Sequence, residues 1–248
     1  MEMENLGNGI IQGNLLQKAG LSHGVSTKIL GNMSFDRDQK NEAKEHTHNF
    51  LENLGLDISE ISLVKLPTRN TTNVALISKP RQPGILVLKE TDSSIAKLHK
   101  FDHYLGIDAC ISNAKNTFLA ILPADCAAVM LFDPKTGFYA LIHAGKAGVE
   151  AGIILKTLLC LQEWTKSIPQ NLLCYIGPNI CQGCYKIGAN HFDLAKEIRY
   201  QLLKGGVREK CIEISQFCTH HHYKLFFSHY RSGGSQTEGR QIAIIGKR

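Results

Sequence analysis

The sequence has no long uninterrupted apolar stretch. None of its 248 residues lies in a run that approaches the roughly 18 apolar residues expected of a membrane-spanning helix. The first residues are acidic, and no basic region is followed by a long apolar core, so a secretory signal is not expected. These absences predict a cytoplasmic protein that does not associate with membranes.

A basic surface suited to nucleic acid is also missing. The chain carries 28 Lys and Arg against 22 Asp and Glu, a formal net charge of +6, and the basic residues are spread along its length. It has neither a basic stripe interleaved with aromatic residues nor a helix-turn-helix pattern, which argues against a nucleic-acid partner. The modest positive charge better suits a rim around a site for an anionic small molecule.

The eight cysteines lack the setting of a disulfide framework, because the chain is long and no export signal is expected; reduced thiols are therefore predicted. Cys181 and Cys184 have the C-x-x-C spacing of a metal knuckle or a redox pair, but no second cysteine pair matches it. Four other cysteines lie among apolar residues and are predicted to be small core residues: Cys110, Cys160, Cys174 and Cys211.

Repeats, low-complexity segments and linkers are absent too, so residues 1–248 are expected to form a single domain. Apolar runs typical of strands cluster between a few segments with helical periodicity. This arrangement favours an α/β fold with mixed sheets flanked by helices.

Three segments are predicted to be helices: Asn41–Leu54, 148–164 and 189–206. Residues 10–27 are expected to form two strands joined by a turn, and residues 224–231 a buried strand leading into a polar loop.

Two apolar runs, 127–132 and 138–142, are separated by the turn sequence "DPKTG" and predict a hairpin. Cys126 precedes the first run and His143 follows the second, so pairing of the strands would make the two side chains neighbours. A His beside a Cys can generate a nucleophilic thiolate, and the same two groups are good zinc ligands. The alternative is a core thiol and a core histidine without chemistry.

Eight motifs follow one another along the chain: "HGVST", "GNMSF", "ADC" before an apolar strand, "HAG", "IGPNICQGCYKIG", "CT", "FFSHYR" and "GRQ". Their order and spacing resemble the YfiH/laccase-domain family, long labelled multicopper polyphenol oxidase, which includes purine nucleoside phosphorylase and adenosine deaminase activities. The resemblance covers nearly the whole chain. It implies an α/β sandwich and, as substrates, purine nucleosides and phosphate.

The resemblance also implies a zinc ion held by one Cys and two His. Motif matching assigns Cys126 and His143 as two of these ligands. The second His position falls on Pro67, whose side chain cannot bind a metal, so the site is expected to be weakened. His99 or His103 could replace the missing ligand.

Two further departures fall in motifs near the expected site. Ala147 stands where the family usually has an arginine, and Lys186 where it has an acid. The run His220–His222 is a second reservoir of imidazoles, although a surface run of His is more often only solvated.

Five other residues are candidates for the site. Asp125 could act on protons or orient His143, or simply make a hydrogen bond at the start of a strand. Four could bind substrate: Asn32, Lys146, Ser228 and Arg231. Arg231, with its forked guanidinium, and Lys146, as a point charge, suit phosphate; their alternatives are surface ion pairs.

Three functions therefore stay open: a zinc-dependent purine nucleoside phosphorylase or deaminase, a metal-free cysteine hydrolase with a Cys126–His143 dyad, and a non-catalytic paralogue. Copper is not expected, because the H-x-H pair His46 and His48 lies within a predicted helix and the run His220–His222 stands alone.

Overall fold

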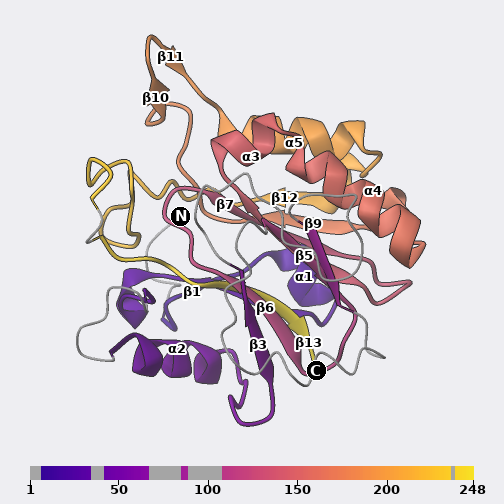
Figure 1. Cartoon of the computed structure of the whole chain (residues 1–248). Coiled ribbons are helices and arrows are strands. Elements are labelled where there is room, and N and C mark those ends of the chain that lie inside the picture. Colours follow the sequence, from indigo (N-terminus) through magenta and orange to yellow (C-terminus); the bar gives the residue numbers. More distant parts are fainter. Residues whose placement is uncertain (1–6, 35–41, 67–84, 89–107, 236–237) are drawn as a thin grey trace.

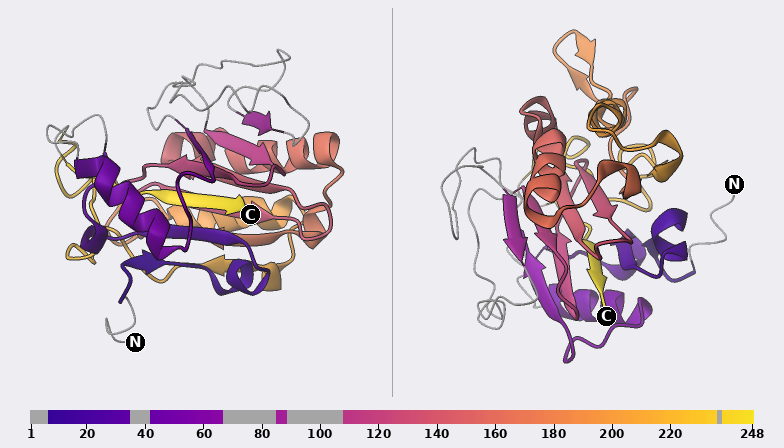
Figure 2. Two further views of the ribbon diagram at one scale, coloured as in Figure 1. Left: turned by 90° about the horizontal axis from the view of Figure 1, so that it is seen from below. Right: turned by 90° about the vertical axis from the view of Figure 1, so that its right-hand side faces the viewer.

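The structure is a computed structural model that describes residues 7–34, 42–66, 85–88, 108–235 and 238–248. Two stacked mixed sheets form its centre, and helices cover both outer faces (Figures 1 and 2). A small two-stranded ribbon of β10 (Lys186–Ile187) and β11 (Asn190–His191) projects from the body at the top of Figure 1.

The larger sheet has the strand order β12-β9-β7-β8-β5-β4. Its central pairs are antiparallel, whereas the pairs at its two edges, β12 with β9 and β4 with β5, are parallel. Its strands are β4 (Ile85–Leu88), β5 (Ala109–Ser112), β7 (Ala127–Phe132), β8 (Tyr139–Ala144), β9 (Leu173–Ile176) and β12 (Ile212–Ile214).

The smaller sheet has the order β1-β2-β13-β6-β3. All its pairs are antiparallel except β3 with β6. Its strands are β1 (Ile10–Ile11), β2 (Ser22–Ser26), β3 (Ser62–Lys65), β6 (Thr117–Ile121) and β13 (Ala243–Lys247). The last strand of the chain therefore lies in the middle of this sheet.

The α-helices are α1 (Asn14–Lys18), α2 (Glu42–Asn53), α3 (Lys146–Glu150), α4 (Ile153–Thr165) and α5 (Leu194–Lys204). Helices α3, α4 and α5 pack on the outer face of the larger sheet and α2 on that of the smaller, whereas Leu16 of α1 belongs to the core between the two sheets. Short 3-10 turns are η2 (Lys28–Leu30), η5 (Pro169–Asn171) and η6 (Glu209–Cys211).

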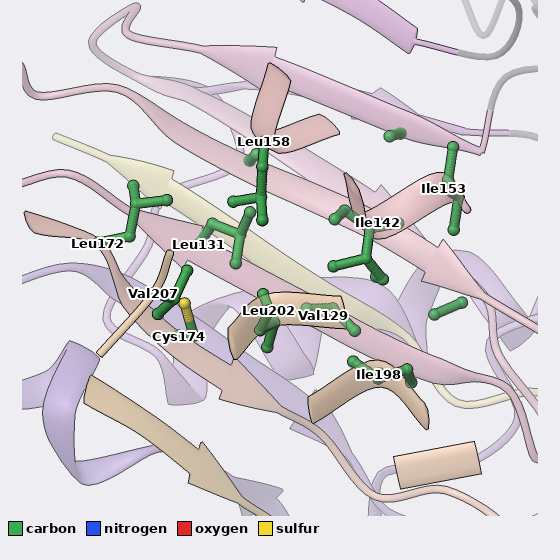
Figure 3. Packing of buried hydrophobic residues seen from close by; sticks show 14 of the residues in the cluster. Val129, Leu131, Ile142, Ile153, Leu158, Leu172, Cys174, Ile198, Leu202 and Val207 are labelled. Carbon is green, nitrogen blue, oxygen red and sulfur yellow. The ribbon is translucent and has the colours of Figure 1, made fainter. Parts of the chain in front are cut away.

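Alternation along the strands divides the apolar side chains between separate cores. Val129, Leu131 and Ile142 point toward Leu158 of α4 and Ile198 of α5, and form the core between the larger sheet and its helices (Figure 3). The central strands are buried on both faces, which is why β7 and β8 are almost continuously apolar.

The opposite faces of the two sheets meet in a second core, in which Met130 and Leu141 pack with Leu119 and Ile245. A third core lies between the smaller sheet and α2 and contains Phe50. The order helix, sheet, sheet, helix confirms the predicted α/β sandwich with mixed sheets.

The helix predictions are confirmed in place but not in every boundary. Residues 148–164 were expected to be one helix, but Gly152, with a φ of 78°, separates α3 from α4. The helix expected from residue 189 starts later, at Leu194, because Asp193 caps it by accepting a hydrogen bond from the N–H of Lys196.

The strand pair predicted for residues 10–27 exists as β1 and β2, but it contains α1 instead of a simple turn. At the start of α1, Glu213 accepts hydrogen bonds from the Leu15 N–H and the Asn14 side chain, each 2.9 Å long. A carboxylate supplied by β12, far along the chain, therefore satisfies this helix terminus.

The buried strand predicted for residues 224–231 is wrong. Leu225 and Phe226 are buried, but the segment forms turns held by hydrogen bonds from both residues to the carbonyl of His222. The sequence also predicts a strand over residues 72–77, which lie outside the described residues. In the part of the chain that is described, no helix is long and apolar enough to cross a membrane.

The buried Tyr139 of β8 ties the two sheets together at one end. Its hydroxyl group lies 2.9 Å from the carbonyl oxygen of Ala114 and 2.7 Å from that of Thr117, at the connection that leads from β5 into β6. The single O–H group of this phenol is thus shared between two backbone carbonyls where the chain passes from the larger sheet to the smaller.

Replacing this phenol by Tyr139→Phe is expected to lower the free energy of unfolding by about 1–3 kcal/mol, because buried carbonyls lose their donor. Urea unfolding measures the effect. Tyr200→Phe, at an exposed position of α5, is the matched control and is expected to change stability by less than about 0.5 kcal/mol. Equal stability of the two variants would contradict the assignment.

Candidate functional site

The β7–β8 hairpin brings Cys126 and His143 together. Ala127 pairs with Ala144 and Ala128 with His143, so Cys126 stands opposite Gly145 just beyond the ladder. Cys126 and His143 are therefore diagonal neighbours on one face of the sheet, the face that carries the core between the two sheets.

Small residues opposite both side chains let them meet. His143 faces Ala128, and a Cβ added to Gly145 would lie only 2.9 Å from the Cys126 sulfur. The thiol thus occupies the space above Gly145, which explains the glycine of the "HAG" motif by close approach. Cys126 is half-buried and His143 is buried.

Asp108 completes a row of three groups. It precedes β5, which pairs with β8 on the side away from β7, and its carboxylate oxygen Oδ1 lies 3.3 Å from Nδ1 of His143. The main chain repeats the contact, since the His143 N–H donates to the Asp108 carbonyl at 2.7 Å. This leaves Nε2 of His143 as the ring nitrogen available for a metal or a proton.

The environment of His143 favours its charged form. Burial alone would lower its pKa, but the Cys126 charge, hydrogen bonds to Asp108 and Cys126 and the Asp108 charge together raise the pKa to about 10. The pairing of β7 with β8 makes Cys126 and His143 neighbours, as the hairpin predicted. Asp108 was not found from the sequence, because nothing near it in the chain marks it.

Asp125 is an anchor for three loop residues. Its buried carboxylate accepts hydrogen bonds from the Thr219 hydroxyl (2.6 Å), the Ser228 hydroxyl (3.0 Å) and the Tyr230 N–H (2.7 Å). Its φ of 82° lies in the left-handed region, which Asp tolerates better than most residues. His143 is oriented instead by Asp108, and the predicted action of Asp125 on protons stays a prediction.

Ser228 and Arg231 belong to the same loop system. Ser228 donates to Asp125 and accepts from the Arg231 N–H at 3.1 Å. The Arg231 guanidinium donates to the carbonyls of Thr219, His220 and Phe226, at 2.7–3.0 Å. Three of its five N–H groups thus hold the backbone, and a role of either residue in substrate binding stays a prediction.

Asn32 and Lys146 have partners within the protein as well. The Asn32 side-chain oxygen accepts from the N–H groups of Ser34 (3.0 Å) and Arg240 (2.9 Å). Lys146, the first residue of α3, lies 2.6 Å from a Glu150 carboxylate oxygen. Both are half-buried, and their binding of substrate also stays a prediction.

Aromatic rings gather close to Cys126, which sequence reasoning did not anticipate. Tyr185 contacts Phe192 and Tyr230 edge to face, with ring centroids 6.1 and 5.7 Å apart, and His220 contacts Tyr230 at 5.9 Å. Burial, followed by the charges of Cys126 and Asp125, raises the pKa of Tyr185, which places its phenol near both.

Two places in the molecule concern metal binding. Within the described residues, no group of three closely spaced ligand atoms includes Cys126 or His143. Pro67, at the expected position of the third ligand, and the alternatives His99 and His103 lie outside the described residues.

A second place holds four ligand atoms. Cys181, Cys184, Cys218 and His221 each offer one atom, and all four atoms lie within 4.8 Å of one another. The sequence offers no second C-x-x-C pair to match Cys181 and Cys184. Cys218 and His221, which have C-x-x-H spacing, supply the second pair of ligands instead. A search for mixed Cys/His pairs would have found it.

The chain matches the family of multi-copper polyphenol oxidoreductase laccases over residues 16–248. It belongs to this family. The laccase-family name does not fix the metal, and in this member the H-x-H pair His46 and His48 lies on α2, where His46 bonds to the Asn32 carbonyl and His48 pairs with Glu52.

Curated relatives of this laccase-family chain include a purine nucleoside phosphorylase of Bacteroides thetaiotaomicron, 30% identical over 52% of the chain and 57% of that protein. A purine nucleoside phosphorylase of Clostridium acetobutylicum is 30% identical over 65% of the chain and 76% of its own length. An adenosine deaminase of an unknown prokaryotic organism is 28% identical over 52% and 58%. The chain spans about three fifths of the length of the first of these.

Solved structures confirm the laccase-family fold. The Bacillus licheniformis protein YfiH superposes with a TM-score of 0.80, 22% identity and 98% coverage of both chains. YlmD from Geobacillus stearothermophilus gives 0.79 and 23%, with 97% of this chain and 96% of that one covered.

The hydrogen bonds of Asp125 lead to a stability prediction. Asp125→Asn keeps the shape and the left-handed backbone but removes the charge, and one of the three donors then faces an amide N–H. The free energy of unfolding is expected to fall by about 1.5–3 kcal/mol, the range for hydrogen bonds to a charged group.

Urea unfolding of Asp125→Asn beside Glu163→Gln, which neutralises an exposed carboxylate of α4, separates this effect from loss of charge in general. The anchor role is rejected if Asp125→Asn is as stable as the control.

Proposed function

We propose that this chain is an enzyme acting on purine nucleosides, by phosphorolysis or by deamination of adenosine, with Cys126 and His143 at its centre. The observation that carries the proposal is the convergence of Cys126, His143 and Asp108 on one sheet face at the strand ends. The names of the relatives, purine nucleoside phosphorylase and adenosine deaminase, supply the substrate class.

The donor set fits zinc, which prefers Cys sulfur and His nitrogen. Asp108, bonded to the second nitrogen of His143, is the outer partner that metal-binding histidines usually have. Cys126 and His143 would hold the ion, and a third ligand would have to come from residues outside those described. When bound, zinc supplies a Lewis acid and an activated water at neutral pH.

The protein's own groups hold the reacting atoms in place. Asp108 fixes the tautomer of His143 through Nδ1, so that Nε2 can accept or return a proton. The aromatic rings of Tyr185 and Tyr230 offer faces and edges against which a purine can pack. Lys146 and Arg231 bring positive charge toward a phosphate.

A cytoplasmic location is part of the proposal. All eight cysteines are free thiols in the structure, which suits a reducing compartment.

A second candidate is a metal-free cysteine hydrolase. Cys126, His143 and Asp108 lie in a row, as do a nucleophile, its base and the carboxylate that orients the base. The contact between Asp108 and His143 is the specific observation that favours this function. Zinc content separates the zinc enzyme from the other two candidates, and fast alkylation of Cys126 by iodoacetamide in metal-free protein would separate the hydrolase from a non-catalytic paralogue.

The main test is turnover of inosine and adenosine with and without inorganic phosphate, together with the zinc content of each variant. Cys126→Ala is expected to lower turnover by about 100-fold or more, the scale for a group that takes part in the chemistry. Its zinc content should also fall relative to that of the wild-type protein.

Cys160→Ala, which removes a thiol from the core beneath α4, is the matched control and should keep its activity. Turnover by Cys126→Ala at the wild-type rate would reject the site. A wild-type protein that turns over none of these nucleosides would favour a non-catalytic paralogue.

Asp108→Asn tests the positioning of His143. With the side chain about one third exposed, the substitution should leave the fold intact. Losing the outer carboxylate is expected to lower both kcat and zinc affinity by about 10- to 100-fold. Steady-state kinetics and competition with a chelator measure the two effects, with the exposed Asp57→Asn as control; unchanged values in Asp108→Asn would remove Asp108 from the site.

A further inference from the structure

We propose that Cys181, Cys184, Cys218 and His221 form a structural zinc site, separate in its ligands from the Cys126–His143 centre. The four residues come from two loops: the one that follows β9 and the one that follows β12. Three sulfurs and one imidazole are a known set of structural zinc ligands.

The spacing of the ligand atoms is close to what zinc requires. With bonds of about 2.3 Å to sulfur and 2.0–2.1 Å to nitrogen, a tetrahedral site has ligand atoms about 3.5–3.8 Å apart. The sulfur of Cys181 and Nδ1 of His221 are 3.7 Å apart, and no pair among the four exceeds 4.8 Å. Side-chain shifts of about 1 Å or less would close the site on an ion.

The backbone around the cluster is arranged for a thiolate. N–H groups of Cys181 and His221 point at the sulfur of Cys218, at 3.3 and 3.5 Å. Each ligand pair spans a single tight turn, closed by a 3.0 Å bond from the Cys184 N–H to the Cys181 carbonyl and a 2.9 Å bond from the His222 N–H to the Cys218 carbonyl. Such N–H donors are the outer partners that tune metal-bound sulfur.

Four protein ligands leave no open position, so the proposed ion is structural and not catalytic. The backbones of the two loops also meet, through the β-bridge between Asn179 and Cys218 and a 3.1 Å hydrogen bond from the Thr219 N–H to the Asn179 carbonyl. Thr219 in turn donates to Asp125, which precedes Cys126. The ion would thus brace the loops beside the catalytic centre.

The test isolates this cluster by using full-length Cys126→Ser, which removes the thiol of the other site. Purified from zinc-supplemented cells, this protein is expected to carry about one equivalent of zinc by elemental analysis, and replacement by Co²⁺ should give the charge-transfer absorption of cobalt–thiolate bonds. Adding Cys184→Ser should lower that absorption by about one third, because one of three sulfur ligands is lost.

His221→Ala in the same background is expected to weaken zinc binding by at least about 10- to 100-fold, the usual cost of losing even an outer-shell partner. Its matched control is His220→Ala, which alters the adjacent histidine, one whose ring is not in the cluster. His221 is exposed, so this variant should fold, and circular dichroism checks that it does.

The proposal is overturned if Cys126→Ser protein carries no zinc, or if His221→Ala and Cys184→Ser bind zinc as tightly as their parent. A disulfide between Cys181 and Cys184 in protein kept under reducing conditions would also overturn it, in favour of a redox pair. None of these outcomes depends on nucleoside turnover, so the structural ion and the proposed enzyme activity can fail independently.

Discussion

The register in which β7 pairs with β8 determines whether Cys126 and His143 can meet at the candidate functional site. Because Ala127 pairs with Ala144, Cys126 and His143 fall on the same face, two residues apart across the ladder. A slip of one residue would send the two side chains to opposite faces and remove the contact. The small residues opposite them are Ala128 and Gly145, and a Cβ at Gly145 would lie only 2.9 Å from the Cys126 sulfur.

Around this hairpin, polar contacts hold loops that share no sheet. Asp125 adopts a left-handed backbone at the mouth of β7, and this turns its carboxylate toward Thr219, Ser228 and the Tyr230 N–H. The Arg231 guanidinium stabilises the same loops by donating hydrogen bonds to three of their backbone carbonyls. Ser228 and Arg231, which the sequence suggests as substrate-binding residues, thus stabilise the loops. Irregular loops lack the hydrogen bonds of helices and sheets, so side chains must pair with their backbone N–H and C=O groups.

Features that depend on residues close together in the sequence could be predicted, whereas features that depend on contacts between distant segments could not. The hairpin and the central helices depend on local periodicity and turn residues, and they were found. Asp108 was missed because it meets His143 only through the non-local pairing of β5 with β8, and α1 was missed because its first N–H groups depend on Glu213. For the same reason Cys218 was missed and His221 was considered only as part of the run His220–His222: two loops without regular structure bring both residues to Cys181.

The two Cys/His centres place different demands on the chain. The proposed chemistry at Cys126 and His143 requires an open coordination position, and a metal held there by only these two side chains would be bound weakly. The cluster of Cys181, Cys184, Cys218 and His221 is closed, and its ion would act by holding two loops together. Loss of the first site would therefore leave the second intact. The metal bound at the proposed catalytic site is then the difference between the zinc content of the wild-type protein and that of a variant without the Cys126 thiol.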